Sequence, residues 1–125
     1  MIYLTLTELL HVAGRVLGPE VAVRDYGLLE AALARPQATA FGKDAYPSLD
    51  AKAAALLHSL AYHHVFMDGN KRTAVIAVTA FLELNGYQVT WTHDAQYPYV
   101  LEVAQGQHAV PDIAEWLAQH VQPAG

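Results

Sequence analysis

The sequence predicts a single, mostly α-helical domain over residues 1–125, with about six helices. Three observations support this fold class. The chain has 125 residues, of which 54% are hydrophobic and 15% charged, and this composition suits one packed core. Apolar residues recur at helical spacing through most of the chain, and short clusters of Gly, Pro, Asn and Asp separate the periodic segments. The sequence contains no repeat, linker or low-complexity stretch.

Six segments carry helical periodicity, and most begin at a residue that suits a helix N-cap. Thr5 has the spacing of a capping box with Glu8. Asp25, Ser48 and Asp94 each precede an apolar run with i, i+3 and i+4 spacing. In chain order, the expected helices cover residues 6–16, 26–34, 49–63, 70–84, 95–104 and 111–120.

Residues 70–85 predict the central helix of the domain. The stretch from Ala74 to Leu82 is apolar almost all round, which is typical of a helix that is buried on most of its faces. Asn85 and Gly86 then provide a C-terminal stop. We therefore expect the other helices to pack around this one.

Three segments lack helical periodicity and predict short elements of other kinds. Residues 1–4 are apolar and predict a brief strand. Residues 37–47 contain Gly, Pro and two aromatic side chains, and they predict a loop or flap held down by its own side chains. Residues 87–91 alternate weakly and predict a short strand. The domain should therefore contain little β-structure.

Charge and cysteine content exclude several classes of function. Seven Lys and Arg residues stand against 12 Asp and Glu residues, so the net charge of −5 argues against general binding to a nucleic-acid backbone or to anionic lipid. Cysteine is absent, which excludes disulfides, thiolate metal sites and cysteine nucleophiles. No apolar stretch approaches the roughly 20 residues of a membrane span, and we expect a cytoplasmic protein.

The segment from His64 to Arg72 concentrates polar chemistry between two predicted helices. Gly69 allows a tight turn, and the free N–H groups at the start of the helix over 70–84 favour an anion. Lys71 and Arg72 add charge-assisted donors, so Gly69, Asn70, Lys71 and Arg72 are the predicted phosphate-binding residues. The pattern therefore predicts a site for a di- or triphosphate.

The same segment supplies candidates for the remaining roles. Asp68 is the predicted Mg²⁺ ligand, because this ion prefers one or two carboxylates together with phosphate oxygens. His64 is the predicted general base, and Phe66 is the predicted apolar anchor of the loop. Outside this segment, His93 is expected to be solvated and Tyr97 to pack at a boundary.

Residues 64–72 resemble the signature of the Fic/Doc (Fido) family, His-Pro-Phe-x-[Asp/Glu]-Gly-Asn-Gly-Arg. The sequence departs from this pattern at Val65 in place of Pro, at Lys71 in place of the second Gly, and at Val75 in place of a second Arg. With a lysine at position 71 and no arginine at position 75, the sequence is similar to the Doc (death-on-curing) branch of the family. So are the length of the chain and its Asn85-Gly86 helix stop.

The resemblance implies the toxin of a type II toxin–antitoxin pair, with a cognate antitoxin as partner. It also implies an enzyme that uses ATP and Mg²⁺ to phosphorylate a hydroxyl on a translation factor, elongation factor Tu being the family's known target. The flap over 37–47 would then present the target segment as an added strand beside the phosphate site. Two alternatives stay open at this point: transfer of AMP, as in Fic enzymes, and a Fido module that binds a nucleotide or partner without turnover.

Overall fold

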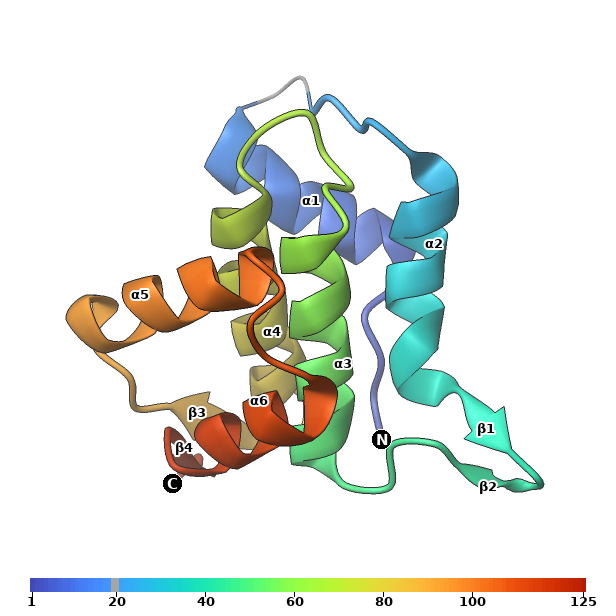
Figure 1. Cartoon of the computed structure of the whole chain (residues 1–125), viewed down its shortest axis with the longest axis vertical. Helices are drawn as coiled ribbons and strands as arrows, with labels where there is room; N and C mark the ends of the chain where they lie inside the picture. The colour runs from blue at the N-terminus through green and yellow to red at the C-terminus, as the bar shows by residue number, and fades with distance from the viewer. Residues whose placement is uncertain (19–20) are drawn as a thin grey trace.

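Residues 1–18 and 21–125 are described by the computed structural model, and six α-helices make up most of them (Figure 1). The helices are α1 (Leu6–Leu17), α2 (Tyr26–Ala34), α3 (Leu49–Tyr62), α4 (Asn70–Leu84), α5 (His93–Ala104) and α6 (Val110–Ala118). The shorter elements are the 3-10 turn η1 (Arg35–Gln37) and the strands β1 (Thr39–Ala40), β2 (Lys43–Asp44), β3 (Tyr87–Val89) and β4 (Val121–Pro123). The predicted mostly helical fold class is confirmed. None of the helices in the described residues has the length and apolar character needed to cross a membrane.

Local capping explains where the helices begin. Thr5 and Glu8 form the predicted capping box, with both reciprocal hydrogen bonds present. Asp25 and Ser48 cap α2 and α3 as expected. The predicted cap of α5 is wrong, because the Thr92 hydroxyl accepts the N–H of Ala95 and the helix begins at His93. Asp94 lies in the first turn instead, where a carboxylate also suits the helix dipole.

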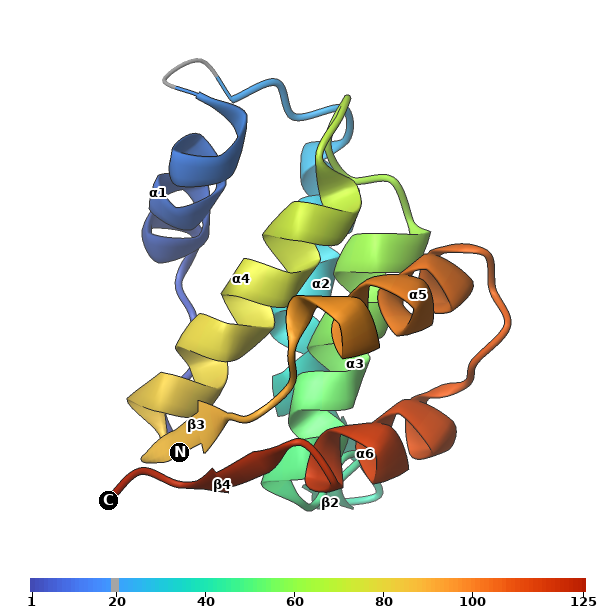
Figure 2. The ribbon, with the colours of Figure 1, turned by 90° about the vertical axis from the view of Figure 1, so that its left-hand side faces the viewer.

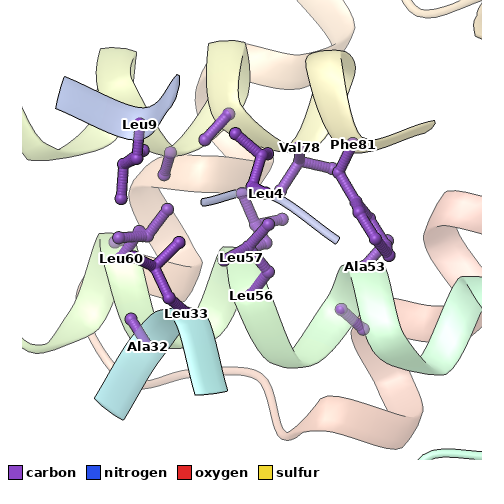
Figure 3. Packing of buried hydrophobic residues seen from close by; sticks show 14 of the residues in the cluster. Leu4, Leu9, Ala32, Leu33, Ala53, Leu56, Leu57, Leu60, Val78 and Phe81 are labelled. Atoms are coloured by element: carbon purple, nitrogen blue, oxygen red, sulfur yellow. The ribbon is translucent and has the colours of Figure 1, made fainter. Parts of the chain in front are cut away.

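The centre of the core is occupied by α3 rather than by α4 alone. Nine residues of α3 are buried, six residues of α4 are buried, and the two helices pack along each other (Figure 2). The alanines at 53–55 leave room for neighbouring helices to approach, so α3 also packs against α2, α5 and α6. Figure 3 shows Leu56, Leu57 and Leu60 of α3 among residues from α1, α2 and α4.

The predicted flap is a small hairpin, β1–β2, that lies away from the α3–α4 loop. Its register pairs Thr39 with Asp44, and the turn residues Phe41 and Gly42 both have positive φ. The buried Lys52, in the first turns of α3, fixes the hairpin by donating to Tyr46 O at 2.6 Å. The α3–α4 loop lies at the opposite end of α3 (Figures 1 and 2). The structure therefore contradicts the interpretation of this flap as a clamp beside the phosphate site.

The chain ends meet the strand that follows α4. The predicted strand over 87–91 is confirmed in a shorter form, β3, which pairs antiparallel with β4. The sequence did not predict β4. Residues 1–4 do not form the predicted strand. The N–H and the carbonyl of Ile2 are both hydrogen-bonded to the side chain of Asn85, so they do not pair with a neighbouring strand.

Candidate active site

The loop between α3 and α4, residues 63–69, is fixed by the segment that precedes α2. Val23 and Phe66 form an antiparallel β-bridge. Three backbone hydrogen bonds of 2.9–3.2 Å around this bridge join residues 22–25 to residues 65–67. Two segments that lie far apart in the sequence therefore form one backbone unit, which determines the path of the loop.

The side chain of Asn70 closes this loop. Its Oδ1 accepts the N–H of Phe66 at 2.8 Å, and its Nδ2 donates to the Phe66 carbonyl at 2.9 Å. This changes the role predicted for Asn70, because its Oδ1 and one N–H of its Nδ2 are used inside the loop, so that the second N–H of Nδ2 and the backbone N–H remain for a phosphate. Phe66 is 1% exposed, and an apolar anchor of the loop has to be buried in this way.

Gly69 lets the chain turn from the loop into α4. Its φ is +73°, in the left-handed region that favours glycine. A β-carbon at this position would lie 1.9 Å from Cδ2 of Leu17, at the end of α1. Glycine is therefore required both by the backbone conformation and by the close approach of α1 to the start of α4.

His64 follows the end of α3, and its side chain is exposed. Its φ is +50°, a conformation that few residues other than glycine adopt. The guanidinium of Arg24 holds this conformation, because Nε donates to the His64 carbonyl at 2.6 Å and Nη2 donates to the His63 carbonyl at 3.1 Å. Sequence reasoning missed Arg24 as a positioning residue, since it lies 40 positions from His64.

The start of α4 forms one wall of a cleft of about 630 Å³. Residues 68–72 all line this cleft, so the structure brings the predicted phosphate and metal residues together. Lys71 is half-buried there and Arg72 is exposed. Val75 continues the wall one turn further along α4. His64 is not part of the lining, although only a few residues of the loop separate it from Asp68.

The cleft is positive at this end. Gly69 gives α4 no side-chain cap, and the first turn of α4 contains no acidic residue, so the free N–H groups and the positive end of the helix dipole face the cleft. Arg15, from the last turn of α1, adds a cation that sequence reasoning missed. Asp68 is the only carboxylate among the described residues that line the cleft. An anion, alone or with a divalent cation, suits this arrangement.

The opposite wall of the cleft comes from α5. His93, Gln96 and Tyr97 line it, and the ring centroids of His93 and Tyr97 lie 5.6 Å apart. His93 is exposed, as expected, and Tyr97 is 51% exposed rather than packed at a boundary; both residues line the cleft, so the roles predicted for them were incomplete. No local motif marks these residues, because α5 reaches the start of α4 only through the fold.

Comparisons with known proteins agree with the loop signature. The model of the Fic/DOC family matches residues 3–82, which include α1, Arg24, the loop and most of α4. The protein Toxin Doc of Mycolicibacterium smegmatis is 54% identical over 92 residues, which cover 74% of this chain and 71% of that protein. This chain is therefore similar to a toxin, and it belongs to the Fic/DOC family.

Proposed function

We propose that this chain is the toxin of a type II toxin–antitoxin pair and that it transfers the γ-phosphate of ATP to a hydroxyl on elongation factor Tu. The observation that carries the proposal is the uncapped start of α4, where Lys71, Arg72 and Arg15 line one cleft with Asp68. The similarity to Toxin Doc supports the toxin role. The expected consequence of expression is inhibited translation and arrested growth.

The cations of the cleft suit a triphosphate. Arg72 can bind phosphate oxygens as a bidentate fork, and Lys71 adds a point charge. A lysine at position 71 also occupies space that the glycine of Fic enzymes would leave to phosphate. Val75, in place of their second arginine, offers no cation for the far end of a triphosphate. These two departures support a pose in which the γ-phosphate, rather than the α-phosphate, faces His64.

Asp68 has the chemistry of a Mg²⁺ ligand. Its carboxylate is exposed and forms no ion pair within the described residues. Mg²⁺ is commonly held by one or two carboxylates together with phosphate oxygens, so a single carboxylate beside the phosphate-binding residues fits this ion. When bound there, the ion would neutralise phosphate charge and orient the transferred group.

His64 would act as the general base of the transfer. Its imidazole accepts the proton of the acceptor hydroxyl as the hydroxyl oxygen forms a bond to the γ-phosphorus. The bond between the γ-phosphorus and the bridging oxygen breaks, and ADP leaves. Lys71 and Arg72 stabilise the charge that develops on the phosphate oxygens. Arg24 supports this step by donating hydrogen bonds to the carbonyls of His63 and His64, which hold His64 in its conformation.

Labelled ATP tests the proposal. The chain is incubated with purified elongation factor Tu and ATP labelled at either the γ- or the α-phosphate, and we expect label from the γ position only. Label from the α position would instead indicate AMP transfer, and no label with retained ATP binding would indicate a module without turnover. His64→Ala should abolish transfer and relieve growth arrest, while the matched control His11→Ala, at an exposed site on α1, should do neither.

The proposed antitoxin has a test of its own. A small reading frame next to this gene, with a C-terminal segment predicted to be disordered, is the expected source, because such segments fold over a partner on binding. Co-expression of that protein should relieve the growth arrest. Persistent arrest, together with no binding between the two purified proteins, would contradict the pairing.

A further inference from the structure

A second hollow, of about 560 Å³, lies between α2 and α3. It is separate from the cleft at the start of α4, where the nucleotide is proposed to bind. Its α2 wall is apolar and includes Ala31 and Ala34, whose small side chains are exposed. Polar groups line the opposite side, from Arg35 and His58 to His63. We call this hollow the α2–α3 groove.

Arg35 is a half-buried cation without a counter-ion at this groove. Its Nε donates to the Tyr46 hydroxyl at 2.9 Å, and its Nη1 contacts Nδ1 of His58 at 2.9 Å and Oγ of Ser59 at 3.0 Å. Within the described part of the chain, Nη2 has no hydrogen-bond partner and Arg35 forms no ion pair. Cations that are withdrawn from water are normally paired, and three fixed bonds make this guanidinium ready to bind a carboxylate.

His58 lines the groove beside Arg35. Burial lowers the pKa of His58, and the nearby Arg35 and His63 lower it further. Arg35 can only donate, so Nδ1 of His58 accepts and the ring proton of the neutral imidazole lies on Nε2. No acidic residue of the described chain lines the groove. The polar side of the groove therefore offers donors and positive charge, and the opposite wall offers apolar contact.

The α2–α3 groove and the cleft at the start of α4 meet the α3–α4 loop at its two ends. His63 lines the groove, residues 68–72 line the cleft, and His64 follows His63 directly. The two hollows therefore share the segment of chain that contains His64, although His64 itself lines neither of them.

We propose that the α2–α3 groove binds the segment of the acceptor protein that is to be modified, and that Arg35 recognises an acidic side chain in that segment. This inference rests on the proposed function, because it assigns a docking site to the acceptor of the same transfer. The guanidinium of Arg35 without an ion pair, the lack of a carboxylate among the described residues that line the groove, and the continuity of the groove with the α3–α4 loop at His63 carry it.

Filling the groove tests the docking step by steady-state kinetics with elongation factor Tu. Ala31→Trp places a large ring on the exposed wall without removing a core contact, and Arg35→Gln removes the cation. Either variant should raise the KM for elongation factor Tu by about tenfold to a hundredfold and leave the KM for ATP unchanged. The matched controls Ala118→Trp on α6 and Lys43→Gln on β2, both exposed and outside the groove, should change neither value.

Carboxylate recognition is tested without an acceptor protein. N-acetyl-glutamate amide, titrated into the full chain, should shift the NMR signals of Arg35 Nε–H and the His58 ring, whereas N-acetyl-glutamine amide should not. No shift with the glutamate probe would overturn the carboxylate site. An unchanged KM for elongation factor Tu in Ala31→Trp would overturn acceptor docking. The same conclusion would follow if this variant lost antitoxin binding but kept transfer.

Failure of the proposed function would look different. If the wild-type chain transferred no phosphate to elongation factor Tu, the proposed function would be wrong, while the titration with the glutamate probe would still decide the carboxylate site. If Arg35→Gln failed to fold, the kinetics of Ala31→Trp would still decide the docking step.

Discussion

A β-carbon at Gly69 would collide with the end of α1, and this makes Gly69→Ala a sensitive test of how the candidate site is built. The ideal Cβ would lie 1.9 Å from Cδ2 and 3.2 Å from Cγ of Leu17. Alanine would also have to adopt a φ of +73°. The left-handed backbone costs about 1–2 kcal/mol, and moving Leu17 off its rotamer costs a further ~0.5–1.5 kcal/mol.

We therefore expect Gly69→Ala to lower the free energy of unfolding by about 1.5–3.5 kcal/mol and the Tm by roughly 5–17 °C. The affinity for ATP should fall as well, because relief of the collision moves the start of α4 away from its present position. The matched control is Gly86→Ala. Gly86 has a φ of +86° and nothing within 4 Å of its ideal Cβ, so this variant isolates the backbone cost of about 1–2 kcal/mol.

A double-mutant cycle with Leu17→Ala separates the two costs. Chemical denaturation of the four proteins should show a favourable coupling of about 1 kcal/mol, because the shortened Leu17 side chain no longer meets the new methyl group. Additive costs, within about 0.5 kcal/mol, would mean that the β-carbon does not meet Leu17. An unchanged Tm for Gly69→Ala would refute the left-handed conformation itself.

Three further predictions concern separate parts of the molecule. Lys71→Met should weaken ATP binding by about tenfold to a hundredfold with an unchanged Tm, whereas the control Lys43→Met should change neither ATP binding nor the Tm. Calorimetric titration and thermal melts measure the two quantities. A loss of Tm as large as the loss of affinity would mean that Lys71 is structural. Lys52→Met should cost about 2–4 kcal/mol and expose the β1–β2 hairpin to limited proteolysis without weakening ATP binding, because it leaves the carbonyls of Tyr46 and Pro36 without their donor. At His108, burial lowers the pKa, but hydrogen bonds to Asp112 and Glu102 raise it overall. The folded-state pKa then exceeds the unfolded one, so this stabilisation is present below about pH 6.5 and is lost as the pH rises through the folded pKa. Denaturation of wild type and His108→Gln at pH 5.5 and 9 should show a larger difference in the free energy of unfolding at pH 5.5, and an equal difference would contradict the charged contacts of His108 with Asp112 and Glu102.

Helix bounds could be predicted where both ends carry a strong local signal. The predicted ranges of α2 and α4 match the structure, because Asp25 caps α2 and Pro36 cannot continue it, while Gly69 and Asn85 bound α4. The start of α5 was predicted from Asp94 alone, whereas the Thr92 hydroxyl, two residues earlier, caps the helix.

Elements that depend on distant partners could not be predicted. β4 is three residues long and carries no pattern of its own; it is a strand because β3, more than thirty positions earlier, pairs with it. The central place of α3 has a similar origin. Each of its alanines at 53–55 has a small side chain, and this allows several helices to pack closely against α3.

The chemistry of the site could be predicted better than its geometry. The loop was identified because acid, base, amide and cations cluster within nine residues. Arg15, Arg24 and the rings of α5 could not be found in this way, because only tertiary packing brings them to the loop. Asn70 shows the reverse case: its residue type suggested a phosphate ligand, while the need to satisfy the backbone of the nearby Phe66 determines where its amide lies.

The conformation of His64 is strained and is held by a dedicated partner. Histidine is tolerated at positive φ more often than most residues, but the conformation remains costly, and glycine would adopt it freely. The chain nevertheless keeps an exposed imidazole at this position and uses the Arg24 guanidinium to hold the two carbonyls beside it. Strain that is maintained by dedicated partners is typical of functional positions. Here the strained residue is the predicted base, which stands in the chain between His63 of the groove and Asp68 of the cleft and lines neither hollow itself.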